Sequence, residues 1–139
     1  MSRIRIDLPS TFSFSAEIPI RITDLNYGNH VGNDTVLSLI HEARVQFLKS
    51  IGYSELEMEG VSLIMSDVGI QFKAELFYGD VVRVQVASQN ITRAGFDLYY
   101  HLTRNGTTVA IAKTGMVCFD YTKRSIASVP EKAREKLSA

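Results

Sequence analysis

Potentially reactive side chains are concentrated in the segment Ile22–Asp34, whose sequence is ITDLNYGNHVGND. Histidine gains or loses a proton near neutral pH, so His30 could act as an acid, a base or a hydrogen-bond donor. Asn26 could orient a water or a carbonyl oxygen, but an amide has no basic oxygen that removes a proton. Asp24 could accept backbone N–H groups and so organise the loop. The alternative is that the segment is only a turn before a helix, with each polar side chain bonded to nearby backbone.

A long helix is predicted directly after this segment. Asn33 or Asp34 is expected to cap its start, and Gly52 is expected to close its end in a left-handed conformation. The first backbone N–H groups of a helix have no acceptor within the helix and favour negative charge, so this end could stabilise an anion. The apolar residues that recur at spacings of three and four form one stripe: Val36, Ile40, Ala43, Phe47 and Ile51.

Alternating patterns predict strands before and after this helix. The run over residues 12–22 reads as a strand, and Pro19 within it favours an edge position or a bulge. A tight hairpin is expected at Asn105-Gly106. Four further strands are predicted over residues 62–76, 79–91, 95–104 and 107–123, and a short polar helix within residues 128–139. One central helix followed by an antiparallel meander indicates an α+β fold whose curved sheet wraps the helix.

The composition limits what the chain can be. Its 139 residues suit one domain over 1–139, and 15 basic residues balance 15 acidic ones, which argues against a nucleic-acid or anionic membrane partner. No signal peptide or membrane-spanning run is apparent, so the cytoplasm is the expected compartment. Cys118 is the single cysteine and is expected to be buried. No metal-ligand spacing, nucleophile elbow or phosphate loop is present, and no cofactor is expected.

The order of elements and three motifs resemble the hotdog-fold acyl-CoA thioesterases of the 4-hydroxybenzoyl-CoA thioesterase-like group. The first motif is DLNYGNHVGN, similar to D-x-D-x-x-x-H-V-N-N. The second is HEAR on the helix, similar to E-x-A-R, and the third is FKAELFYGD, similar to aromatic-x-x-P-x-x-x-G-D. The resemblance extends from about Phe14 to Tyr121 and implies a hotdog fold, with a long central helix wrapped by a curved antiparallel sheet.

The chain departs from this group at positions that affect the mechanism. Asn26 replaces the second acid of D-x-D, which commonly serves as nucleophile or base, so that role cannot be carried over. Gly32 replaces the first asparagine of H-V-N-N, and Glu75 replaces the proline. The plant acyl-carrier-protein thioesterases, which are hotdog relatives, carry a glutamate that aligns with Glu75 and a histidine that aligns with His30. This resemblance makes Glu75 the best candidate for the missing base.

The resemblance implies a thioester hydrolase that acts by water attack on a small or medium acyl-CoA or acyl-carrier-protein substrate. In the resembled enzymes a backbone N–H seven residues past the catalytic acid holds the carbonyl oxygen, and that count from Asn26 gives Asn33. Glu42 is the rival base, because a helix glutamate serves in another thioesterase branch, although it is more often a solvated position. The candidate catalytic residues are therefore Asn26, His30, Asn33, Glu75, Asp24 and Glu42.

The resemblance also implies partners and a substrate pocket. The CoA moiety would belong to the substrate rather than to a resident cofactor. Hotdog domains usually pair, so a homodimer or homotetramer is expected, with Glu75 near a loop of the partner. Apolar residues expected near the site suit an aliphatic or an aromatic acyl group: Met65, Phe72, Phe77 and Tyr78.

Two other activities fit the first motif. Hotdog enoyl-CoA hydratases use a D-x-N-P-x-H-like loop, which Asp24, Asn26 and His30 resemble, but Tyr27 replaces the proline and His30 lies one residue too far along. A non-catalytic acyl-CoA binding protein would also fit, because the usual acid is missing.

Overall fold

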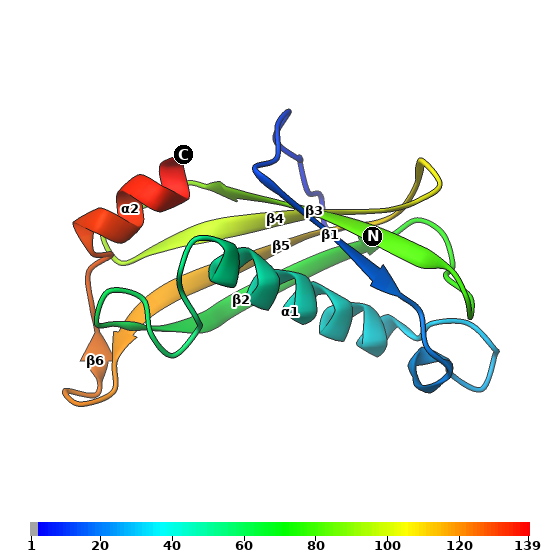
Figure 1. Cartoon of the computed structure of the whole chain (residues 1–139), viewed down its shortest axis with the longest axis horizontal. Helices are drawn as coiled ribbons and strands as arrows, with labels where there is room; N and C mark the ends of the chain where they lie inside the picture. The colour runs from blue at the N-terminus through cyan, green and yellow to red at the C-terminus, as the bar shows by residue number, and fades with distance from the viewer. Residues whose placement is uncertain (1–2) are drawn as a thin grey trace.

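The structure is a computed structural model that describes residues 3–139. One long helix, α1, lies along the inner face of an antiparallel sheet that curves around it (Figure 1). The predicted α+β architecture, a central helix wrapped by a curved antiparallel sheet, is confirmed. The elements in chain order are β1 (Phe14–Pro19), the 3-10 helix η1 (Ile22–Asp24), α1 (Asn33–Ser50), β2 (Ser62–Phe72), β3 (Val81–Gln89), β4 (Gly95–Arg104), β5 (Thr107–Asp120), β6 (Ser125–Ile126) and α2 (Glu131–Ser138).

The strands follow the order β1-β3-β4-β5-β2, and β6 pairs with β5. Pro19 ends β1 at one edge of the sheet, as its missing N–H predicted. The Asn105-Gly106 hairpin joins β4 to β5 with φ values of 49° and 81°, the left-handed pair that a tight primed turn requires. β2 ends four residues earlier than predicted, because the N–H groups of Lys73 and Ala74 both bond to the Val109 carbonyl instead of continuing the ladder.

Helix α1 has the predicted apolar stripe, and its end closes as predicted. Gly52 has φ of 90°, its N–H bonds to the Lys49 carbonyl, and the Tyr53 N–H bonds to the Leu48 carbonyl, which together form a Schellman motif. The expectation that Asn33 or Asp34 caps the start was wrong. The N-cap is Gly32, which has no side chain to donate or accept, so the first turn of α1 is left open.

The core lies between α1 and the inner face of the sheet, where burial of each large aliphatic side chain stabilises the fold by about 1.5–3 kcal/mol. A buried network of hydrogen-bonded side chains crosses this core. Arg44 of α1 donates to the Tyr100 hydroxyl at 3.4 Å, and that hydroxyl bonds to Thr114 Oγ1 at 2.8 Å. Burial raises the pKa of Tyr100, so the hydroxyl stays protonated. The fully buried apolar residues of this core include Ile40, Ala43, Leu48, Val82, Val84, Leu98, Leu102 and Ala112.

The outer face of the sheet is crossed by residues 4–12, which we call the N-terminal strap. The Ile6 N–H donates to Gln71 Oε1 at 3.2 Å on β2, and the Phe12 ring lies 6.0 Å from the His101 ring on β4. A side chain at Gly69 would contact Ile4 and Ile6 of the strap. The two faces of the sheet are thus covered differently, the inner one by α1 and the outer one by this strap.

Candidate active site

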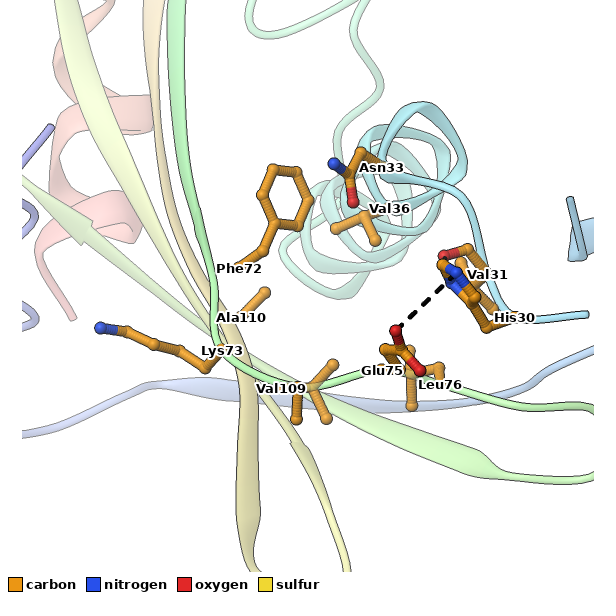
Figure 2. A pocket seen from close by; sticks show the side chains of 11 residues that line it. His30, Val31, Asn33, Val36, Phe72, Lys73, Glu75, Leu76, Val109 and Ala110 are labelled. Atoms are coloured by element: carbon orange, nitrogen blue, oxygen red, sulfur yellow. Dashed lines mark hydrogen bonds and ion pairs between the residues drawn. The ribbon is translucent and has the colours of Figure 1, made fainter. Parts of the chain in front are cut away.

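A cavity of about 380 Å³ opens at the N-terminus of α1, between the helix and the segment that follows β2. Figure 2 shows His30 and Glu75 facing each other on one side of it, with Asn33 and Val36 above and Phe72 opposite. The structure therefore brings together three of the six predicted site residues. The apolar part of the wall is formed by Val31, Val36, Phe72, Ala74, Leu76, Val109 and Ala110.

His30 and Glu75 form the polar centre of this cavity. Nε2 of His30 lies 3.8 Å from Oε1 of Glu75, too far for a direct hydrogen bond but close enough for one water to contact both. The other ring nitrogen, Nδ1, lies 3.1 Å from the Val31 carbonyl oxygen. Since a carbonyl only accepts, Nδ1 carries the hydrogen, and Nε2 of the neutral ring is an acceptor that faces Glu75.

The start of α1 borders the same cavity and has unpaired backbone donors. The first N–H groups of the helix that bond within it are those of Thr35 and Val36, and both bond to the Gly32 carbonyl. No side chain within residues 3–139 caps the helix. The N–H of Asn33, the first helical residue, therefore stays available at the positive end of the helix dipole.

The segment that carries Glu75 is held on both sides of this residue. The Leu76 carbonyl accepts the Val31 N–H at 2.9 Å, which ties the segment to the chain just before α1. The Leu76 side chain is buried, and the Glu75 carbonyl accepts a hydrogen bond from Arg104. Glu75 itself keeps 60% of its side chain exposed, so its carboxylate is accessible to water.

Asn26 shapes the loop in front of the cavity. Its Oδ1 accepts the Gly28 N–H at 2.8 Å, and its backbone N–H donates to the His30 carbonyl at 2.8 Å. These bonds form a turn that fixes the backbone of His30. Oδ1 is thus engaged by the chain itself, and Asn26 is not among the residues that line the cavity.

Asp24 and Glu42 lie elsewhere, in a groove between β1 and α1 that His30 and Glu75 do not line. Asp24 is buried, accepts the Arg21 N–H at 2.8 Å and pairs with the Arg21 guanidinium at 3.5 Å, so it organises the turn η1. Glu42 accepts a hydrogen bond from Gln46 at 2.7 Å, one helical turn on.

The other two histidines and Cys118 lie outside the cavity. His41 bonds to Glu55 at 2.8 Å, and His101 bonds to Thr108 at 2.9 Å. Burial raises the pKa of the Cys118 thiol to about 11. Within the described part of the chain, no group of three or more histidine, cysteine, aspartate or glutamate side chains could hold a metal ion. No helix of residues 3–139 combines the length and apolar character that crossing a bilayer requires.

Sequence reasoning found Phe72 but missed most of the apolar wall. Of the four apolar residues expected near the site, only Phe72 lines the cavity. Val109 and Ala110 were missed because they belong to the β5 strand pattern, which indicates burial but not which cavity a strand borders.

Comparisons with known proteins agree with this geometry. A sequence model for the thioesterase-like superfamily matches residues 20–137. A curated protein of Aquifex aeolicus, named provisionally as an esterase, is 31% identical over 98 residues, which cover 69% of this chain and 75% of that protein. A 1,4-dihydroxy-2-naphthoyl-CoA hydrolase of Nostoc punctiforme is 25% identical over 122 residues, which cover 86% of this chain and 82% of that protein.

A solved structure shares the fold at lower identity. A thioesterase of Thermus thermophilus in complex with coenzyme A and Zn superposes with a TM-score of 0.82 at 24% identity. The match covers 93% of this chain and 100% of that one. The hotdog architecture therefore extends over nearly the whole chain.

Proposed function

This chain belongs to the thioesterase-like superfamily, and on that premise we propose that it hydrolyses acyl-CoA thioesters with Glu75 as the base that activates water. One observation carries the proposal. His30 and Glu75 face each other 3.8 Å apart in a cavity that also contains the open N-terminus of α1. A base and a set of anion-stabilising donors are the two things that hydrolysis by water requires.

The proposed attack follows from the directions of the acceptors. A water between Nε2 of neutral His30 and the Glu75 carboxylate donates one hydrogen to each and so directs a lone pair at the thioester carbonyl. As the water oxygen bonds to the carbonyl carbon, Glu75 takes its proton. The carbonyl oxygen gains negative charge and is stabilised by the Asn33 N–H. The tetrahedral intermediate then collapses, the C–S bond breaks, and the CoA thiolate leaves and takes the proton from Glu75, which restores the carboxylate.

Two of the other predicted site residues, Asn26 and Asp24, take supporting roles in this proposal. Asn26 holds the loop that orients His30, and Asp24 holds the turn before it, because both side chains are engaged with local backbone. Glu42 is not assigned a part, since it lies in a different groove from His30. The substrate is proposed to be a small or medium acyl-CoA, or the same acyl group on a carrier protein. An aromatic acyl-CoA is the first to test, given the name of the Nostoc relative.

We also propose a homodimer or homotetramer in the cytoplasm. β2 is an edge strand, and its apolar side chains Ile64, Met65, Val68 and Phe72 are each more than a third exposed. A second copy that pairs along β2 would cover these side chains and satisfy the free ladder groups. Because Phe72 and Glu75 line the same cavity, the second copy would also reduce the exposure of Glu75 to bulk water. Sedimentation of a monomer alone at micromolar concentration would contradict this assembly.

The enzymatic proposal is tested with Glu75→Gln and the matched control Glu42→Gln. Benzoyl-CoA, hexanoyl-CoA and crotonyl-CoA are incubated with each protein while free thiol and the enoyl absorbance are followed. Loss of the base should lower kcat about 10²–10⁴-fold in Glu75→Gln, and Glu42→Gln should stay near wild type. A fall in Glu42→Gln alone would move the base to the helix. Loss of enoyl absorbance without thiol release would indicate a hydratase, and binding without turnover would indicate a binding protein.

A further inference from the structure

Arg104 lies at the end of β4 and reaches the segment that carries Glu75. Its Nη1 donates to the Glu75 backbone carbonyl and also lies 3.3 Å from Oδ2 of Asp80. That same Asp80 oxygen accepts the Phe77 N–H at 2.8 Å. One guanidinium nitrogen therefore joins the base-bearing residue to the turn that ends its segment.

The contact is partly shielded from solvent. The side chains of Arg104 and Asp80 are 24% and 26% exposed, so their attraction is less screened than that of a fully solvated pair. Arg104 is not among the residues that line the cavity and does not contact its open space. Its contacts with the site are therefore made through the residues that it holds.

The other restraints on this segment act at neighbouring residues. The Val31 N–H holds the Leu76 carbonyl at 2.9 Å, and the Val109 carbonyl holds the N–H of Ala74 at 3.0 Å. Glu75 lies between these two bonds, and its own carbonyl is held by Arg104. Loss of this bond would free the peptide that follows Glu75 to rotate, and the direction of the carboxylate would change with it.

We infer that Arg104 is a positioning residue, which sets the orientation of the Glu75 carboxylate toward His30 through the Glu75 carbonyl and Asp80. This inference rests on the proposed role of Glu75 as the base. A base displaced by about 1 Å loses up to 10²-fold in rate, since proton transfer depends steeply on geometry.

A double-mutant cycle tests this inference. Arg104→Gln should lower kcat about tenfold or more with benzoyl-CoA or hexanoyl-CoA, whichever is hydrolysed, and leave KM within about twofold, because Arg104 does not touch the cavity. In the Glu75→Gln background the same change should have no further effect on kcat, since the group that it positions is gone. Arg104→Lys, which keeps the charge and a donor, should recover part of the loss. The matched control is Arg83→Gln, whose arginine bonds to Ser15 on the sheet surface at 2.9 Å, and it should be silent.

The outcomes separate the inference from the proposed function. Full activity in Glu75→Gln would overturn the assignment of the base and this inference with it. Loss in Glu75→Gln, but wild-type kcat in Arg104→Gln, would overturn the inference and leave the base in place. An equal loss from Arg104→Gln in both backgrounds would also overturn it, because that is the result of a general structural effect. If Arg104→Gln does not fold, the same cycle is run with Arg104→Lys and read in the same way, with a smaller expected loss.

Discussion

Replacement of Asn33 by proline removes one backbone N–H from the start of α1 while the helix can still form. Asn33 is the first residue of α1, a position where proline is favoured because the N–H has no acceptor within the helix. The residue before a proline must be extended, and Gly32 already has φ of −71° and ψ of 155°. The substitution therefore removes the proposed carbonyl-binding donor with little disturbance of the backbone.

The expected effect on activity is much larger than the effect on stability. The Asn33 side chain is exposed, so its loss should change the free energy of unfolding by about 0.5 kcal/mol or less. Removal of one preorganised donor to a developing oxyanion typically costs about 2.7–4 kcal/mol in the transition state, which lowers kcat about 10²–10³-fold. KM should change little, because the ground-state carbonyl gains less from the donor than the transition state does.

The assay is thiol release from the acyl-CoA that the wild-type protein hydrolyses fastest, with urea unfolding of each variant alongside. Asn33→Ala is the matched control, since it deletes the same side chain but keeps the N–H, and it should remain near wild type. Wild-type kcat in a stably folded Asn33→Pro variant would refute the role of this helix end. Equal losses in the two variants would assign the effect to the Asn33 side chain instead.

Two further predictions concern the core. Tyr100→Phe deletes the hydroxyl that joins Arg44 to Thr114 and should lower the free energy of unfolding in urea by about 1–3 kcal/mol. The control Tyr99→Phe, on the outer face of the sheet, should leave the free energy of unfolding nearly unchanged. Equal stability of the two variants would contradict the buried network. Burial raises the pKa of Cys118 from 9.0 to about 11. Between these two pH values the unfolded chain has lost the thiol proton that the folded chain keeps. The stability contributed by this neutral thiol should be complete below pH 9 and should be lost as the pH rises toward 11. Urea midpoints at about pH 8 and about pH 10 should therefore differ more for the wild-type protein than for Cys118→Ala, and identical pH dependences would be evidence against the shift.

The parts of the fold set by local chemistry could be predicted from the sequence. The spacing of apolar residues predicted α1, and Gly52 and Asn105-Gly106 predicted the backbone reversals where φ is positive. The cap of α1 could not be predicted this way. Asn33 and Asp34 both have side chains suited to capping, but the chain enters the helix one residue earlier, at Gly32, and leaves the first turn open.

The site depended on contacts that no local pattern contains. Glu75 follows a strand and His30 precedes a helix, and a bond between the Val31 N–H and the Leu76 carbonyl brings their segments together. From the sequence, only the resemblance to known thioesterases indicated that His30 and Glu75 belong to one site. Asp24 lies close to His30 in sequence, but its side chain turns back to the Arg21 backbone.

The N-terminal strap restricts how copies of this chain could assemble beyond a pair. Ile4, Ile6 and Phe12 occupy the outer surface of the sheet over Gly69, Gln71 and His101. Two sheets stacked back to back would compete with the strap for that surface, so such a tetramer requires residues 4–12 to be displaced first. Dimers joined through the β2 edge could associate further around α1 without that displacement. Deletion of the strap should therefore affect only the back-to-back association of the sheets.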